Sequence, residues 1–172
     1  MVPEQITVLF DRETIAVRVT EMGREISDFY RGQPLTVVVL MTGGMIFAAD
    51  LVRAMDIPVW IDSIAVASYH GHASSGELKF RSDLKLDVKD RHVLLVDEVF
   101  DTGLTLNAVR RRMSSAGALS VKAAVAVVKE VSRSPECIMP EFSGFTAPDR
   151  YLIGYGLDSN EDGRQIPFIG AV

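Results

Sequence analysis

The chain has 172 residues, a formal net charge of −5 and a single cysteine, Cys137. This length suits one domain with a substantial core, and 48% hydrophobic with 24% charged residues is the composition of a globular protein. The acidic balance disfavours broad nucleic-acid binding, and no stretch has the pattern of a membrane span or signal peptide. A single cysteine cannot form an intrachain disulfide, which suits the reducing cytoplasm. The sequence therefore predicts a cytoplasmic protein without a membrane partner.

The first half of the chain alternates helical and strand patterns. Residues 12–31 are predicted to form an amphipathic helix, because apolar side chains recur at helical spacing: Ile15, Val19, Met22, Ile26 and Phe29. Residues 35–41 predict a buried strand, 45–55 a second helix and 57–67 another strand. The polar, glycine-rich residues 68–77 predict a loop, and the apolar alternation from Leu78 to Leu86 predicts extended strands beside it.

The segment 93–105 carries the strongest chemical signal. Its apolar start predicts a buried parallel strand, which runs into Asp97 and Glu98 and then into the turn Asp101-Thr102-Gly103-Leu104-Thr105. The amides at the start of the following helix and the threonine hydroxyls suit a phosphate, and the two acids suit a polyol or hydrated Mg²⁺. Together they indicate a ribose 5-phosphate. The alternative, an ordinary turn with a capped helix, has no use for adjacent acids at a buried strand's end.

Elements after this turn complete an α/β pattern. The helix after the turn is expected to bury Leu104, Ala108, Val109 and Met113 and to leave the arginines 110–112 in solvent. Residues 120–131 predict another buried strand. Regular alternation from 35 to 131 predicts a mostly parallel twisted sheet flanked by helices, with ligands at the carboxyl ends of its strands.

Residues 138–170 differ from this core in composition and in element length, with several glycines and prolines and short predicted strands such as 151–156. They predict a small lobe folded over the sheet edge. The whole chain, 1–172, is therefore expected to be one domain, with a core over about 33–135. The hood lobe is expected to comprise about 138–172 together with the N-terminal segment.

Segment 93–105 resembles the phosphoribosyl-diphosphate (PRPP) signature of the type I phosphoribosyltransferases: four hydrophobic residues, two acids, three variable positions including an acid, then Thr/Ser-Gly-x-Thr. Over nearly its whole length the chain is similar to the bacterial hypoxanthine–guanine phosphoribosyltransferases. The resemblance implies purine salvage: Mg²⁺-dependent transfer of the 5-phosphoribosyl group from PRPP to N9 of hypoxanthine or guanine. The products would be IMP or GMP and pyrophosphate.

The resemblance implies roles for the residues of the signature. Asp97 and Glu98 would hold the ribose hydroxyls, directly or through Mg²⁺, and Asp101 would face purine N7 as general base or electrostatic stabiliser. PRPP and its 5-phosphate would be bound by Asp97, Glu98, Asp101, Thr102, Gly103, Leu104 and Thr105.

Four further segments have implied roles. The turn of Thr42, Gly43 and Gly44 resembles the pyrophosphate loop, which Arg164 would assist, and Asp158 lies where the family places a carboxylate for a second Mg²⁺. Many relatives have a lysine or arginine where this chain has Thr42, so backbone N–H groups would bind pyrophosphate here, with the Met41–Thr42 peptide cis. Purine binding would fall to Lys129, Tyr151 and Leu152, and loop closure to Ser68 and Tyr69.

Two alternatives stay open. A xanthine-preferring phosphoribosyltransferase would use the same residues, because Lys129 and the backbone near Leu152 serve every 6-oxopurine. A PRPP-binding RNA regulator of the same fold would need a basic face, which a net charge of −5 disfavours. The expected partners are PRPP and 6-oxopurine bases rather than nucleic acid, and the family implies a homodimer or homotetramer.

Overall fold

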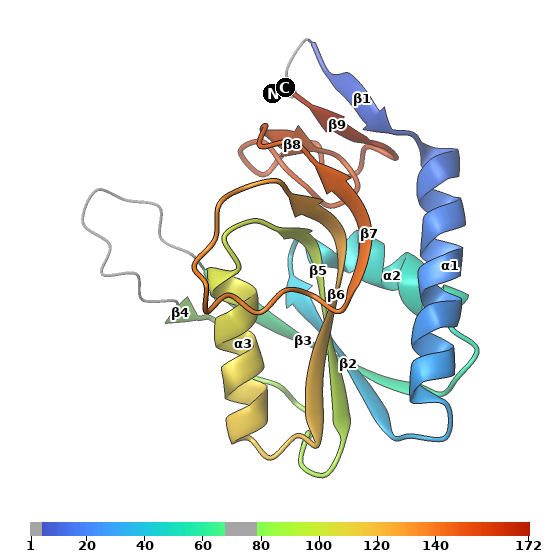
Figure 1. Ribbon diagram of the computed structural model, residues 1–172, viewed down its shortest axis with the longest axis vertical. Helices are drawn as coiled ribbons and strands as arrows, with labels where there is room; N and C mark the ends of the chain where they lie inside the picture. The colour runs from blue at the N-terminus through green and yellow to red at the C-terminus, as the bar shows by residue number, and fades with distance from the viewer. Residues whose placement is uncertain (1–4, 68–78) are drawn as a thin grey trace.

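The computed structural model describes residues 5–67 and 79–172, which form two β-sheets and three helices (Figure 1). In chain order the elements are β1 (Thr7–Phe10), α1 (Arg12–Tyr30), β2 (Leu35–Met41), α2 (Gly44–Ala54), β3 (Val59–Ala67), β4 (Lys79–Phe80), β5 (His92–Phe100), α3 (Leu104–Ser115), β6 (Ser120–Lys129), β7 (Phe142–Ala147), β8 (Leu152–Ile153) and β9 (Ile169–Ala171).

The larger sheet has the strand order β4-β3-β2-β5-β6-β7. Every neighbouring pair from β3 to β7 is parallel, and only β4 at the edge runs antiparallel. This confirms the predicted mostly parallel sheet. The chain leaves β2 toward β3 on one side and later resumes with β5 on the other side. The strand order therefore reverses between β2 and β5, which is where α/β sheets of this kind form a ligand crevice.

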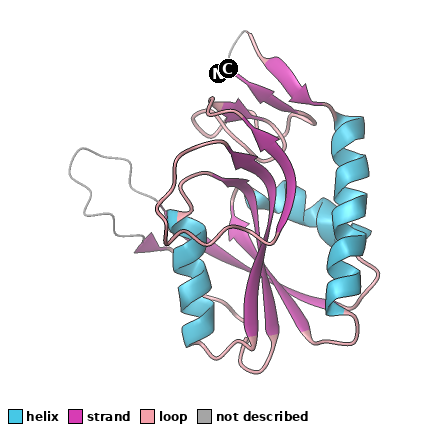
Figure 2. Ribbon diagram, in the orientation of Figure 1, coloured by secondary structure: helices cyan, strands magenta, loops and turns pink. Residues whose placement is uncertain are grey.

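Helices cover both faces of this sheet (Figure 2). Alternate strand residues point to opposite faces, so Val37, Leu94 and Val96 pack with α1 and α2 in one buried cluster. Val38 and Leu95 join α3 in the other. Because strands buried on both faces need apolar residues at nearly every position, the continuous runs in β2, β5 and β6 are explained by this layering.

The smaller sheet joins opposite ends of the described chain. Its order is β1-β9-β8, and both pairings are antiparallel. Figure 1 shows it beyond the carboxyl end of the larger sheet, above β5 and β6. The N-terminal strand and the C-terminal residues thus meet over the edge where the candidate site residues lie.

Two helical faces differ from the prediction. Helix α1 starts after Asp11, whose carboxylate accepts the Thr14 N–H at 2.8 Å, and it buries Tyr30 rather than Phe29. Helix α3 leaves Leu104, its first residue, 68% exposed and instead buries Leu106 and Arg110. The expectation that all three arginines 110–112 are solvated was therefore wrong for Arg110.

Two predicted strand regions are shorter than expected. Between β4 and β5, residues 81–91 form bends, turns and irregular segments rather than strands. Strand β8 ends at Ile153, since Gly154, Tyr155 and Gly156 all have positive φ values and turn the chain. Among the described residues no helix is long and apolar enough to cross a membrane.

Candidate functional site

The turn after β2 and the end of β5 lie directly against each other. A Cβ built on Gly43 would collide with the Glu98 carboxylate, and one on Gly44 would lie 2.9 Å from the Val96 carbonyl oxygen. Glycine at these positions lets the turn approach without displacing the Glu98 side chain or crowding the backbone of β5. The Met41–Thr42 peptide is cis, as predicted, and α2 begins at Gly44, so the turn residues lie at the positive end of a helix dipole.

Asp97 and Glu98 form an acid pair at the carboxyl end of β5. Both are half-buried. Burial, and then the adjacent charge of Glu98, raise the pKa of Asp97 well above its ordinary value, although the Glu98 N–H donates to its carboxylate at 3.0 Å. The ionised form of the pair is thus disfavoured in this place, and a bound cation would stabilise it.

The chemistry of this donor set fits Mg²⁺. The described residues contain no group of three side chains able to hold a metal by themselves. Mg²⁺, however, is commonly bound by one or two carboxylates together with substrate oxygens and water. Asp97 and Glu98 supply hard oxygen donors of this kind beside the turn that would receive a phosphate.

The predicted phosphate turn requires a glycine at its centre. Gly103 has a φ of 80°, and a Cβ there would lie 2.5 Å from Cys137 Sγ and 2.8 Å from Phe100 Cζ. The first helical bond of α3 runs from the Asn107 N–H to the Gly103 carbonyl at 3.0 Å. Helix geometry leaves the amides before Asn107 without intrahelical partners, and they are the natural donors to an anion.

Lys129 brings two distant acids together. Its ammonium lies 2.9 Å from Asp149 Oδ1 and 3.5 Å from Asp101 Oδ2. Asp101 follows β5 and Lys129 ends β6, which are neighbouring strands of the parallel sheet. The two side chains that were predicted to face the purine therefore lie side by side.

Tyr151 and Leu152 adopt different roles in the structure. Tyr151 is 55% exposed, and its hydroxyl donates to the Asp158 carbonyl at 2.9 Å, which holds the ring at the surface. Leu152 is buried in β8 and pairs with Ala171. Its side chain packs in the core, so only its backbone could contact a base.

Arg164 is engaged by acidic neighbours. Its guanidinium lies 2.8 Å from Asp158 Oδ1 and 3.0 Å from Glu161 Oε2, and it donates to the Gly156 carbonyl at 2.8 Å. A Cβ on Gly156 would collide with the Gly43 carbonyl. Arg164 and Asp158 are therefore held beside the predicted pyrophosphate turn through the backbone of Gly156.

Comparison with known proteins agrees with this geometry. Residues 6–160 match the model of the phosphoribosyl transferase domain family. This chain belongs to the phosphoribosyltransferase family. It is 39% identical to a hypoxanthine-guanine phosphoribosyltransferase of Aquifex aeolicus, over 95% of this chain and 93% of that protein.

Two further relatives support the assignment of this phosphoribosyltransferase. A hypoxanthine-guanine-xanthine phosphoribosyltransferase of Tritrichomonas foetus is 31% identical over 95% of this chain and 89% of that protein. The crystal structure of a hypoxanthine phosphoribosyltransferase from Staphylococcus aureus superimposes with a TM-score of 0.90 at 31% identity. It covers 96% of this chain and 90% of that one.

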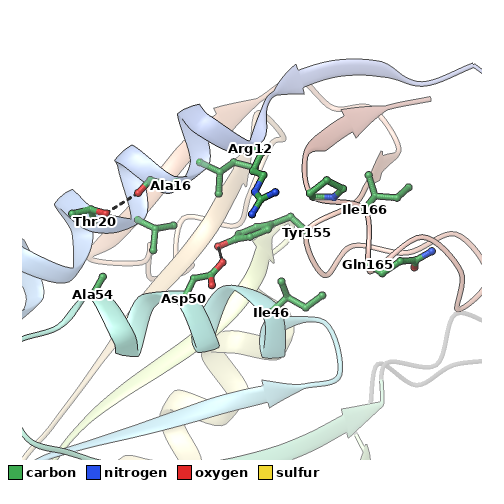
Figure 3. A pocket seen from close by; sticks show the side chains of 12 residues that line it. Arg12, Ala16, Thr20, Ile46, Asp50, Ala54, Tyr155, Gln165 and Ile166 are labelled. Carbon is green, nitrogen blue, oxygen red and sulfur yellow. Dashed lines mark hydrogen bonds between the residues drawn. The ribbon is translucent and has the colours of Figure 1, made fainter.

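The phosphoribosyltransferase also has a cavity of about 560 Å³ beside the site rather than in it (Figure 3). It lies between α1, α2 and the residues before β9. Tyr155 and Asp50 both line it, and the Tyr155 hydroxyl donates to Asp50 Oδ2 at 2.8 Å. Of the predicted site residues none lines this cavity. Tyr155 links it to the site, because Gly156 follows directly.

Sequence interpretation missed three side chains near the site. Asp149 pairs with Lys129, Glu161 pairs with Arg164, and Arg133 contacts the backbone of Asp101. Arg133 could have been identified from the sequence, because it lies just beyond the carboxyl end of a predicted strand. Ser68 and Tyr69, predicted to close over the site, lie outside the described residues.

Proposed function

We propose that this protein transfers the 5-phosphoribosyl group of PRPP to N9 of hypoxanthine or guanine, with Mg²⁺ as cofactor and pyrophosphate as the second product. The observation that carries this proposal is the pairing of Asp101 with Lys129, 3.5 Å apart at the ends of β5 and β6. A 6-oxopurine presents an N7–H donor beside an O6 acceptor, and this carboxylate and ammonium are complementary to both. Adenine has an amino group at position 6 and lacks that acceptor.

The acid pair and the phosphate turn would hold the sugar. Amides and hydroxyls of Thr102–Thr105 would bind the 5-phosphate, and Asp97 and Glu98 would face the ribose hydroxyls. Breaking the anomeric C–O bond develops positive charge on the ribose, which these carboxylates favour electrostatically. Mg²⁺ held by Asp97 and Glu98 would supply the charge that neutralises the departing pyrophosphate.

The purine would lie between the strand ends and Tyr151. Asp101 would accept the N7 proton, or its hydrogen bond, as N9 becomes nucleophilic. Lys129 would donate to O6, the exposed ring of Tyr151 would stack on the base, and the Leu152 carbonyl would accept a ring or exocyclic N–H.

Backbone amides of Thr42, Gly43 and Gly44 would bind the pyrophosphate at the start of α2. Arg164 would add a cation by exchanging part of its contact with Asp158 and Glu161, which would leave Asp158 available for a second Mg²⁺. Closure by Ser68 and Tyr69 and assembly into a homodimer or homotetramer stay predictions from the family resemblance, and a cytoplasmic location stays a prediction from the single cysteine.

The test is pyrophosphate release from PRPP with hypoxanthine, guanine, xanthine or adenine, with and without Mg²⁺. We expect turnover with hypoxanthine and guanine, none with adenine, and loss of turnover when Mg²⁺ is chelated. A higher kcat/KM for xanthine than for the other bases would instead support the xanthine-preferring alternative. Failure to turn over any of these bases would contradict the proposal, and RNA binding by such a protein would favour the regulator.

A further inference from the structure

Arg133 connects the ends of two strands where their own pairing stops. The ladder between β5 and β6 ends at Phe100 and Val128. Beyond it, Arg133 Nε donates to the Asp101 carbonyl at 2.7 Å and Nη2 to the Phe100 carbonyl at 3.2 Å. The same guanidinium donates to the carbonyls of Lys129 and, at 3.3 Å, Val131. One side chain thus bridges the backbone of both strand ends.

The guanidinium also rests on an aromatic ring beneath the phosphate turn. Its central carbon lies 4.9 Å from the centroid of Phe100, which is buried and whose ring borders Gly103. Arg133 itself is half-buried. A planar guanidinium with five N–H donors can contact several carbonyls and stack on a ring at once, whereas a lysine ammonium is a compact point charge.

We propose that Arg133 is a positioning residue for the purine. Its contacts fix the backbone of Asp101 and of Lys129 relative to each other, and these are the two residues whose side chains would meet the N7 and O6 edge. Arg133 would act only through them and would touch no reacting atom. This inference rests on the proposed function, because it assumes that Asp101 and Lys129 contact the base.

The kinetic test compares Arg133→Gln and Arg133→Lys with the wild type. Because small misplacements of reacting groups are costly, we expect Arg133→Gln to lower kcat about tenfold or more and to raise the hypoxanthine KM about tenfold. The KM for PRPP should change less than about threefold. Arg133→Lys should recover only a small part of the loss. Arg31→Gln is the matched control, since among the described residues the ion pairs of Arg31 are with exposed Asp28 and Asp56, and it should behave as wild type.

A second measurement does not require activity. Hydrogen exchange of the ligand-free protein should show faster exchange for residues 99–103 and 129–133 in Arg133→Gln, with β2 unchanged. If the wild type has no activity with any purine, the proposed function fails while hydrogen exchange still reports on the Arg133 contacts. Wild-type values of kcat and hypoxanthine KM in Arg133→Gln would overturn the inference. A fall in kcat with both KM values unchanged would also overturn it, because only the folded fraction would have fallen.

Discussion

Lys129 is the residue whose surroundings most restrict the chemistry of the site. Burial alone would lower the pKa of its ammonium, but the hydrogen bond to Asp149 and the charge of Asp101 together raise it. Lys129 is therefore a cation at neutral pH, held by acids from two loops. Sequence could predict Lys129 and Asp101, because one ends a strand and the other directly follows one, where the family resemblance places purine contacts. The third partner could not be predicted, because nothing local indicates that the loop after β7 returns to Lys129.

Asp101→Asn should separate catalysis from substrate binding. On the proposed function, loss of the carboxylate would remove the acceptor for the purine N7 proton, so we expect kcat for hypoxanthine to fall about 10²-fold or more while the KM for PRPP changes little. Asp149→Asn is the matched control: it removes the negative charge 2.9 Å from the Lys129 ammonium, but residue 149 would not face N7. It should raise the purine KM more than it lowers kcat. Steady-state kinetics that give Asp101→Asn a near-normal kcat would exclude Asp101 as the base.

At the scale of elements, Glu141 joins α3 to the edge of the large sheet. Its carboxylate accepts from Arg110 Nη1 and Nη2 at 2.8 and 2.9 Å and from the Ala123 N–H at 2.8 Å. Periodicity predicted α3 itself but placed Arg110 in solvent. The helix is rotated so that Leu104, beside the phosphate turn, faces outward while Arg110 turns toward Glu141. Burial of the Arg110 charge requires a partner such as Glu141, which lies far along the chain. Helical spacing cannot reveal such a partner.

Glu141→Gln should therefore destabilise the fold in a pH-dependent way. Burial raises the pKa of Glu141, but hydrogen bonds from Arg110 and Ala123 outweigh this and lower it below its ordinary 4.5. Its stabilisation is then complete above about pH 4.5 and is lost as the pH falls through the lower folded value. We expect the variant to lose about 2 kcal/mol of unfolding free energy at pH 7.

Urea denaturation at pH 7 and at decreasing pH measures this effect. The difference between Glu141→Gln and wild type should narrow as the pH drops below about 4.5. Glu21→Gln provides the control, because Glu21 pairs with Arg18 on the surface and its side chain is 52% exposed. That change should alter the unfolding free energy by less than about 1 kcal/mol. A constant difference at all pH values would show that Glu141 acts by packing rather than by charge.

At the scale of the whole molecule, the residues that follow β8 of the smaller sheet contact the predicted pyrophosphate turn after β2 of the larger one. Most strands of the larger sheet follow from apolar segments and were predicted, but β7 was not. Residues 138–170 were expected to lie in the hood lobe, whereas Phe142–Ala147 pair with β6 in the larger sheet. The smaller sheet depends on β1 meeting β9 from the other end of the chain, a pairing that periodicity cannot specify. Between them, Tyr155 has a φ of 51° and bonds to Asp50 of α2, which places Gly156 against Gly43. The contact between Gly156, after the smaller sheet, and Gly43, after β2, therefore depends on residues far apart in the chain rather than on local sequence.

Gly156→Ala should disturb pyrophosphate binding through this contact. The new methyl would meet the Gly43 carbonyl, and the φ of 101° would strain any side chain. We expect the KM for PRPP to rise at least about tenfold, since the amides of the turn would shift from their ligand. Gly32→Ala isolates the backbone effect: its φ is 77°, but its Cβ would meet nothing within 4 Å. It should cost about 1 kcal/mol of stability and leave every KM unchanged. Equal kinetic behaviour of the two variants, with folded fractions matched, would mean that the Gly43–Gly156 contact does not position the pyrophosphate turn.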